Sequence, residues 1–241
     1  MDSQLVALVT GANRGIGLET VKQLAEQGVH VLLASRDLQK GKAAAAPLIA
    51  AGLPVEPIEL DIKRHDTFAK VAADIDSRFG KLDILVNNAA VNFDKPGEQN
   101  WEMGKWRETF EVNVFSVMAL NEALLPVIEK SSAGKIINLS TILASLTLHT
   151  DPKSPIYGFL YPAYDVSKTA LNAYTVHLAH LLKDSPISVT MVHPGWVKTD
   201  MGGEEAPMEI PDGAKSTVEV ALATDKSFHG KFVHMGKELP W

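Results

Sequence analysis

The sequence contains no cysteine among its 241 residues. Disulfide bonds and thiolate metal ligands are therefore excluded, and a reducing compartment is permitted. Long hydrophobic runs are also missing. The segment Met1–Gln4 is polar and the apolar run after it is too short to span a bilayer, so nothing resembles a signal peptide. We expect a cytoplasmic protein that does not work at a membrane.

Basic residues are fewer than acidic residues in this sequence. The chain has 23 Lys and Arg residues against 29 Asp and Glu residues, which gives a formal net charge of −6. This balance argues against nucleic acid or an anionic membrane as the main partner. Hydrophobic residues make up 46% and charged residues 22%, as in ordinary globular proteins. No repeat or linker divides the chain, so residues 1–241 are expected to form one α/β domain.

A glycine-rich segment follows the first apolar run. Residues 5–9 are predicted to be a buried strand, and residues 10–17 come directly after it with the sequence TGANRGIG. A helical pattern begins at Ile16 and ends near Gly28. Glycines between a strand and a helix let the backbone approach a phosphate, and the helix N-terminus offers free N–H groups to an anion. The alternative is a glycine-rich turn in an unspecialised βα unit.

The second predicted strand ends in residues that bear on cofactor choice. Residues 29–34 form an apolar run that is followed by Ser35 and Arg36. An acidic residue at this strand end suits a ribose 2′-hydroxyl, whereas an arginine suits a 2′-phosphate. Arg14 in the glycine-rich segment is a second guanidinium for the same phosphate. The pair favours NADP over NAD, the alternative being two solvated surface arginines. Asp37 is expected to start the next helix.

Strands and helices alternate along the rest of the chain. Further strands are predicted over 55–60, 82–86, 135–139, 187–192 and 231–235, and helices over 37–51, 63–79, 101–130 (broken near Pro126) and 164–182. This alternation predicts a doubly wound, seven-stranded parallel sheet flanked by helices, the Rossmann arrangement. Ligands in such sheets bind beyond the carboxyl ends of the strands. Asp61, Ile62 and Asn88 follow strands and belong at that edge; Asp61 either accepts a hydrogen bond from an adenine amino group or caps a helix.

Three segments are predicted to be loops. Residues 91–100 are polar, and residues 142–163 are long, irregular and contain proline. Residues 200–213 are rich in glycine, proline and acids and are interpreted as a mobile flap over the substrate. Long loops in compact domains are usually functional or interfacial.

The helix predicted over 164–182 begins with a tyrosine and a lysine four residues apart. Residues at this spacing lie on one helix face, so Tyr164 and Lys168 can present a phenol and an ammonium to one place. A nearby cation favours the phenolate and lowers the tyrosine pKa, which would suit proton transfer near neutrality. Helical pairs at this spacing are common, so the motif depends on the residues upstream.

Together these motifs resemble the short-chain dehydrogenase/reductase family, and more narrowly its NADPH-dependent carbonyl reductases. The resemblance covers essentially the whole chain and rests on six features in register. They are the glycine-rich segment 10–17, Asn87-Asn88-Ala89-Ala90, Asn113, the hydroxyl residues after Asn138, Tyr164 with Lys168, and Pro194-Gly195. It implies a single Rossmann domain that reduces a ketone or aldehyde to an alcohol, reversibly, with NADP(H).

The resemblance also implies roles for individual residues. Tyr164 matches the catalytic acid/base, and Lys168 matches the lysine that lowers its pKa and holds the nicotinamide ribose. Asn113 matches an asparagine that binds a water in the proton relay. The residues implied to bind the cofactor are Gly11, Asn13, Arg14, Gly15, Ile16, Gly17, Ser35, Arg36, Asp61, Ile62, Asn88, Ala89, Ala90, Tyr164, Lys168, Pro194, Gly195, Val197 and Thr199.

The chain departs from the family pattern in three places. Ala90 stands where the family usually has glycine, and its Cβ would crowd the nicotinamide. The catalytic serine is usually the second hydroxyl residue after the strand asparagine; counted from Asn138, this is Thr141, with Ser140 as the alternative. The segment between Thr141 and Tyr164 is longer than usual and should line the substrate pocket or cover a face used for oligomerisation.

Two other functional classes are compared with a carbonyl reductase. A protein that binds NADP as a sensor or scaffold without turnover is the main alternative, although such a role would not need Tyr164, Lys168 and Asn113. A serine hydrolase is set aside because the Gly-x-Ser-x-Gly elbow is missing. His177 and His180 have no carboxylate partner at metal spacing, so no metal site is expected. Monomer, homodimer and tetramer all remain open.

Overall fold

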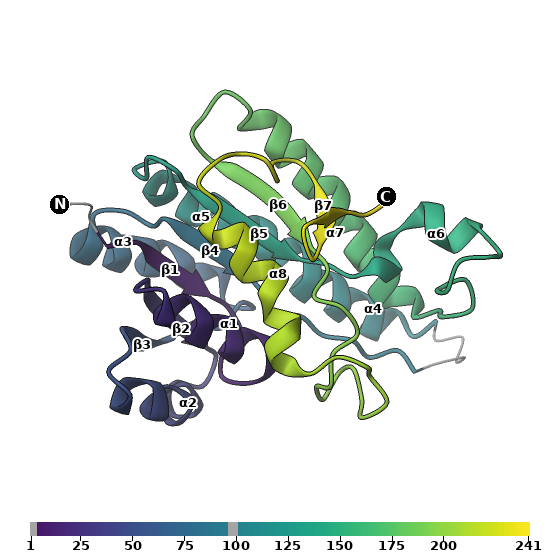
Figure 1. Cartoon of the computed structure of the whole chain (residues 1–241), viewed down its shortest axis with the longest axis horizontal. Coiled ribbons are helices and arrows are strands. Elements are labelled where there is room, and N and C mark those ends of the chain that lie inside the picture. Colours follow the sequence, from purple (N-terminus) through teal and green to yellow (C-terminus); the bar gives the residue numbers. More distant parts are fainter. Residues whose placement is uncertain (1–3, 96–100) are drawn as a thin grey trace.

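The computed structural model describes residues 4–95 and 101–241. Its strands form one sheet in the order β3-β2-β1-β4-β5-β6-β7-β8 (Figure 1). The strands are β1 (Val6–Val9), β2 (His30–Ser35), β3 (Val55–Glu59), β4 (Ile84–Asn87), β5 (Lys135–Leu139), β6 (Ser188–Val192), β7 (Phe232–His234) and β8 (Lys237–Glu238). The first seven are parallel, as predicted, and the two-residue β8 adds an antiparallel edge.

Helices cover both faces of the sheet. The α-helices are α1 (Gly15–Glu26), α2 (Leu38–Ala50), α3 (Phe68–Phe79), α4 (Met103–Phe110), α5 (Ser116–Ile128), α6 (Leu146–Thr150), α7 (Pro162–Leu181) and α8 (Ile210–Leu222). Short 3-10 turns lie at η1 (His65–Thr67) and η3 (Ile142–Ala144), and the π-helical segment η2 (Glu111–Phe115) joins α4 to α5. One face of the sheet packs on α3, α5 and α7, and the other on α1, α2 and α8. This is the doubly wound arrangement expected from the sequence.

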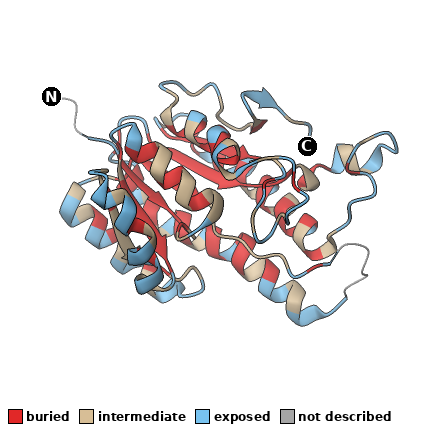
Figure 2. Ribbon diagram, turned by 60° about the horizontal axis from the view of Figure 1, so that its bottom comes forward, coloured by how far each residue is buried: buried red, intermediate tan, exposed pale blue. Residues whose placement is uncertain are grey.

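The central strands lie between two hydrophobic clusters, which explains their continuous apolar sequences. Alternate residues of β1 belong to opposite clusters: Val6 and Leu8 to one, Ala7 and Val9 to the other. Figure 2 shows the buried residues concentrated in the sheet and on the helix surfaces that face it. Burial on both faces is typical of parallel sheets.

The strand order reverses beside β1. From β1 the chain proceeds outward through β2 to β3, and then returns to β4 on the opposite side of β1. The crevice outside the carboxyl ends of β1 and β4 is the position at which such sheets bind ligands. A ligand site is therefore expected at the turns that follow β1 and β4.

Three predicted boundaries were wrong. Helix α5 continues through Pro126 to Ile128, because Leu124, Val127 and Ile128 pack into the core. The segment 142–163 contains η3, α6 and the first residues of α7 rather than only loop.

The third boundary concerns the expected flap. Helix α8 begins at Ile210, so the last four residues of the range 200–213 are helical. Proline is favoured in the first turn of a helix, and Pro211 stands there. In the predicted loop 91–100, residues 91–95 have no regular structure, and residues 96–100 lie outside the described part of the chain.

The stretch Met103–Ile128 is long and apolar enough to cross a membrane by length and composition alone. Its most apolar window is 56% buried inside the fold. Burial of this kind is what a core helix of an α/β domain requires, and α5 supplies Leu120 and Leu124 to the core.

Candidate active site

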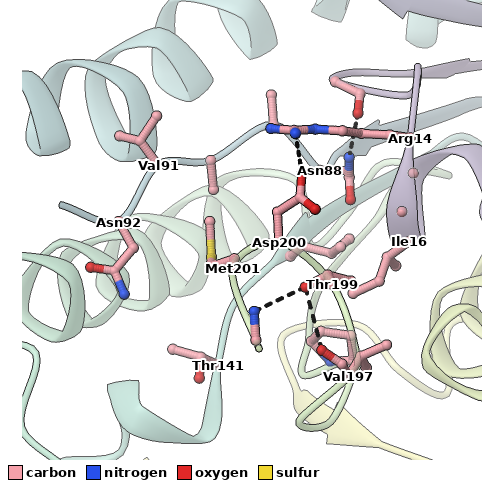
Figure 3. Close-up of a pocket in the computed structure, with 18 of the residues that line it drawn as sticks. Arg14, Ile16, Asn88, Val91, Asn92, Thr141, Val197, Thr199, Asp200 and Met201 are labelled. Carbon is pink, nitrogen blue, oxygen red and sulfur yellow. Dashed lines mark hydrogen bonds and ion pairs between the residues drawn. The ribbon is translucent and has the colours of Figure 1, made fainter. Parts of the chain in front are cut away.

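A large cleft opens at the carboxyl ends of the strands, with a volume of about 1790 Å³. A pocket for one drug-sized ligand is usually ~300–1,000 Å³, so this cleft has room for a dinucleotide and a second molecule. Every residue predicted to bind a cofactor lines it, as do Thr141, Tyr164 and Lys168. Asn113 does not line the cleft and is buried behind it. Figure 3 shows part of the lining.

The glycine-rich turn leaves one end of the cleft open to an anion. Gly11 and Gly15 have positive φ angles of 62° and 57°, which a side chain would strain. A Cβ at Gly17 would collide with the side-chain amide of Asn88. Arg14, at the N-cap of α1, makes no side-chain capping bond, and the first turn of the helix carries no acid. The free N–H groups of α1 therefore fit a diphosphate.

Asn88 and Thr10 join the turns after β4 and β1. The Asn88 side chain donates to the Thr10 carbonyl oxygen (2.8 Å), and the Thr10 hydroxyl accepts from the backbone N–H groups of Asn88 (3.0 Å) and Ala89 (3.1 Å). Thr10 was not among the predicted residues. Its sequence position, between the end of β1 and the first glycine of the turn, could have indicated its role. These bonds set the spacing of the two turns between which a ligand must lie.

The cleft is positively charged beyond the end of β2. Arg36 lines it, and so does Lys40, one turn into α2. Lys40 was not among the residues predicted to bind a cofactor, although its position four residues after Arg36 could have indicated it. Asp37 caps α2 by accepting from the N–H groups of Gln39 and Lys40, as expected. A 2′-phosphate would meet these cations here, while the Asp37 carboxylate is engaged by the helix.

Arg14 and Asp61 have partners of their own. Arg14 forms an ion pair with Asp200, from the segment after β6, across the cleft (Figure 3). Both side chains are mostly exposed, and such pairs contribute little to stability, so an anionic ligand can compete for Arg14. Asp61 accepts from the Lys63 N–H at 3.0 Å in the turn before η1 and also lines the cleft. The helix-cap alternative is wrong, because η1 begins only at His65 and its N-cap is Arg64.

The segment after β6 folds over the glycine-rich turn. Gly195 has φ 96°, and a Cβ there would collide with Met208. The Thr199 hydroxyl donates to the Val197 carbonyl oxygen (3.3 Å) and accepts from the Gly202 N–H (3.0 Å). This ordered turn brings Val197 and Thr199 to the cleft opposite α1.

Tyr164 and Lys168 lie together in the first two turns of α7, but not as the simple pair expected. The Lys168 Nζ donates to the Leu139 carbonyl oxygen at 2.7 Å and lies 5.8 Å from the centre of the Tyr164 ring. Burial lowers the pKa of Lys168 to about 7 and raises the pKa of Tyr164 above its ordinary value. The expected lowering of the tyrosine pKa is not seen in this structure, because burial, and then the charge of Asp165, raise that pKa.

The two hydroxyl residues after Asn138 point in different directions. Ser140 donates to the side-chain oxygen of Asn172 at 2.6 Å, inside the protein. Thr141 accepts a long bond of 3.3 Å from the Leu143 N–H, and its hydroxyl donates to no residue of the described chain. Figure 3 shows Thr141 in the cleft lining. Its hydroxyl is thus the one left to bind a ligand.

Asn113 joins three elements through its side chain. Its oxygen accepts from the Val91 N–H (2.9 Å), and its nitrogen donates to the Val91 carbonyl oxygen (2.9 Å) and to the Ser167 hydroxyl (3.0 Å). It stands in η2, and π-helical turns are frequent at functional sites. Asn113 therefore fixes the loop after β4 against α7.

Among the described residues, no group of three His, Asp or Glu side chains could hold a metal ion. Aromatic and apolar side chains dominate the other end of the cleft instead. Phe159 and Trp196 meet edge to face, with ring centres 6.3 Å apart, and the Trp196 Nε1 donates to the Gly202 carbonyl oxygen at 2.7 Å. With its only donor used, Trp196 presents an apolar surface to the cleft.

Comparison with known proteins matches this geometry to a family. The sequence pattern of the short chain dehydrogenases matches residues 5–210. The chain is 32% identical to short-chain dehydrogenase/reductase 1 of Saponaria officinalis, over 98% of this chain and 95% of that protein. It is 28% identical to carbonyl reductase [NADPH] 1 of Mus musculus, over 99% of both. The crystal structure of NADPH-bound carbonyl reductase from chicken fatty liver superposes with a TM-score of 0.86, at 26% identity, over 99% of this chain and 100% of that chain.

Proposed function

The chain belongs to the short chain dehydrogenase family, an oxidoreductase family that binds nicotinamide cofactors, and we propose that it reduces a ketone or aldehyde to an alcohol with NADPH. One observation carries the proposal. Tyr164, Lys168 and the free Thr141 hydroxyl line the same cleft as the uncapped N-terminus of α1. A hydride donor and a proton donor can thus reach one carbonyl group.

NADPH is proposed over NADH for two reasons. Arg36 and Lys40 line the end of the cleft where the adenosine ribose of such a cofactor belongs, and no acid stands at the end of β2. The mouse relative is named an NADPH enzyme, and the chicken carbonyl reductase was solved with NADPH bound. The diphosphate would lie at the N-terminus of α1 beside Gly15.

When bound, the nicotinamide supplies the hydride. Tyr164 donates a proton to the carbonyl oxygen, and the Thr141 hydroxyl donates a hydrogen bond to the same oxygen as negative charge develops on it. The proton returns to Tyr164 through a relay of Lys168, a water and Asn113. The family resemblance implies that Asn113 binds a water molecule of this relay. The hydrogen bonds of Asn113 to Val91 and Ser167 suit a residue that holds the site together.

The substrate is proposed to be apolar around its carbonyl group. Ile142, Leu143, Phe159, Trp196 and Met201 line the cleft near Thr141 and Tyr164. Burying a substrate carboxylate or phosphate against these side chains would cost its hydration. A neutral ketone or aldehyde with a ring or branched chain fits better.

NADPH oxidation over a panel of ketones, aldehydes and diketones tests the function, with NADH run in parallel. We expect turnover of neutral apolar carbonyls and much slower turnover with NADH. Tight NADPH binding without turnover across the panel would favour the alternative, a non-catalytic sensor or scaffold. Comparable rates with the two cofactors would contradict the assignment of Arg36.

Replacing Arg36 by glutamine should weaken NADPH binding selectively. A hydrogen bond to a charged group contributes roughly 1.5–3 kcal/mol, so we expect the Kd for NADPH to rise about 10–100-fold and the Kd for NADH to change little. Isothermal titration calorimetry measures both constants. Arg64→Gln is the matched control, since Arg64 pairs with Asp66 on the surface and does not line the cleft. Equal losses for the two cofactors would refute a 2′-phosphate contact.

A further inference from the structure

One wall of the cleft comes from the segment that directly follows Thr141. Ile142 and Leu143, the first two residues of η3, line the cleft, and only Ser145 separates η3 from α6. The two elements have three and five residues. Helices this short are not stable in water by themselves. The position of the wall therefore depends on contacts with the rest of the protein.

Two hydrogen bonds hold η3. The Thr169 hydroxyl of α7 donates to the Ala144 carbonyl oxygen at 3.0 Å, and it shares this proton with the Asp165 carbonyl oxygen of its own helix. His149 of α6 contacts the Leu143 carbonyl oxygen through its Nε2 at 2.8 Å. Because the second bond joins η3 to α6, a displacement of α6 is transmitted to Leu143.

Trp241, almost a hundred residues further along the chain, holds the N-terminal turn of α6. Its backbone carbonyl oxygen accepts the Thr147 N–H at 2.7 Å. In Figure 1 this end of the chain returns from β7 toward α6. The first N–H groups of a helix have no acceptor within the helix. The Ser145 hydroxyl accepts one of them, from Leu148, and Trp241 accepts another.

The indole ring of Trp241 anchors this carbonyl group. It stacks on Phe232 of β7, with ring centres 6.0 Å apart, and Phe232 is completely buried. The Leu239 N–H donates to the Phe232 carbonyl oxygen at 2.7 Å, which turns residues 239–241 back along β7. Trp241 does not line the cleft. Its route to the substrate therefore passes through α6.

We propose that Trp241 is a positioning residue for substrate binding, which holds α6 and η3 so that Ile142 and Leu143 form the wall against which a bulky carbonyl substrate packs. The inference rests on the proposed function, because it takes the cleft beside Thr141 as the carbonyl site. Loosening the wall lowers the fraction of molecules that are ready to bind, and the apparent affinity falls by that fraction. A small carbonyl compound does not need the wall to reach Thr141.

The test measures KM and kcat at saturating NADPH for a bulky ketone, 4-phenylcyclohexanone, and for a small aldehyde, propanal. Trp241→Ala should raise the KM for the ketone roughly three- to tenfold, the net effect of about one hydrogen bond. The KM for propanal, both kcat values and the Kd for NADPH should stay close to those of the wild type. Trp241→Phe keeps a ring to pack on Phe232 and should restore most of the affinity for the ketone.

Two substitutions at Thr147 address the same contact from α6. Thr147→Pro removes the N–H that donates to Trp241, in the first helical turn, where proline is tolerated. Thr147→Ala keeps that N–H and is the matched control. The proline variant should raise the KM for the ketone as Trp241→Ala does, and the alanine variant should not. Because Trp241→Ala and Thr147→Pro disrupt one contact, their effects should not add in the double variant.

Trp101→Ala is the control for losing an exposed stacked ring. Trp101 stacks on Trp106 with ring centres 5.9 Å apart and does not line the cleft, so the KM for the ketone should not change. A purely structural role for Trp241 would lower kcat for both substrates without a selective change in KM. That result, or equal rises of KM for the ketone and propanal, would overturn the inference.

Hydrogen–deuterium exchange followed by mass spectrometry gives a readout that does not depend on turnover. Peptides that cover residues 142–150 should exchange faster in Trp241→Ala and Thr147→Pro than in the wild type, and peptides from α1 should not. If no carbonyl compound is reduced, the proposed function fails, and the exchange rates still decide whether Trp241 holds this wall. Unchanged protection of residues 142–150 in both variants would overturn the inference.

Discussion

Tyr164→Phe should lose at least roughly 10²–10⁴-fold in kcat/KM for carbonyl reduction, the usual contribution of positioned proton transfer. Phenylalanine keeps the ring, which lies half-buried in the cleft lining, and removes the only atom that can donate the proton. The variant should be slow throughout the pH range in which the wild type reduces carbonyls. Steady-state NADPH oxidation measures both.

Cofactor binding separates this loss from misfolding. The variant should bind NADPH with nearly wild-type affinity, since the diphosphate and 2′-phosphate regions of the cleft are untouched. Tyr157→Phe is the matched control: Tyr157 is an exposed tyrosine on the segment before α7 and does not line the cleft. A Tyr164→Phe variant with near-wild-type reduction at saturating NADPH would show that another group supplies the proton.

Thr141→Val should lower kcat for carbonyl reduction by roughly 10²–10³-fold, the usual cost of removing one hydrogen-bond donor to a developing oxyanion. Valine preserves the branched shape of threonine and its restricted χ1, so the loss reports the hydroxyl. Thr141→Ser keeps the hydroxyl and should retain most of the activity. The same steady-state assay at saturating NADPH measures each kcat.

Ser140→Ala distinguishes the two candidate hydroxyls. It leaves the Asn172 oxygen, which now accepts at 2.6 Å, without its donor. We therefore expect a loss of about 1–3 kcal/mol in the free energy of unfolding and a small change in kcat. Urea denaturation measures the first quantity. The opposite pattern, a large kcat loss for Ser140→Ala and a small one for Thr141→Val, would reassign the catalytic hydroxyl.

Much of the fold followed from local sequence. Gly11, Ser35, Asp61 and Asn88 each follow a short apolar run, which predicted that they share one edge of a parallel sheet, and all four line the cleft. The reason is that parallel strands present their carboxyl ends together. The extent of α5 was not predictable from Pro126, because core packing of Leu124, Val127 and Ile128 outweighs one lost backbone hydrogen bond.

The sequence by itself determined the family and the parallel sheet, and it placed Tyr164 and Lys168 on one helix, since these depend on the order and spacing of motifs. Only the tertiary structure decided which hydroxyl is left for a ligand, because Ser140 and Thr141 are adjacent and both line the cleft, and only Ser140 donates to a buried partner. It also decided the electrostatic environment of Tyr164. Burial, and then the charge of Asp165, raise the pKa of Tyr164, which is opposite to the shift expected from a lysine at i+4. Desolvation and long-range contacts are properties of the packed protein, and no local pattern contains them.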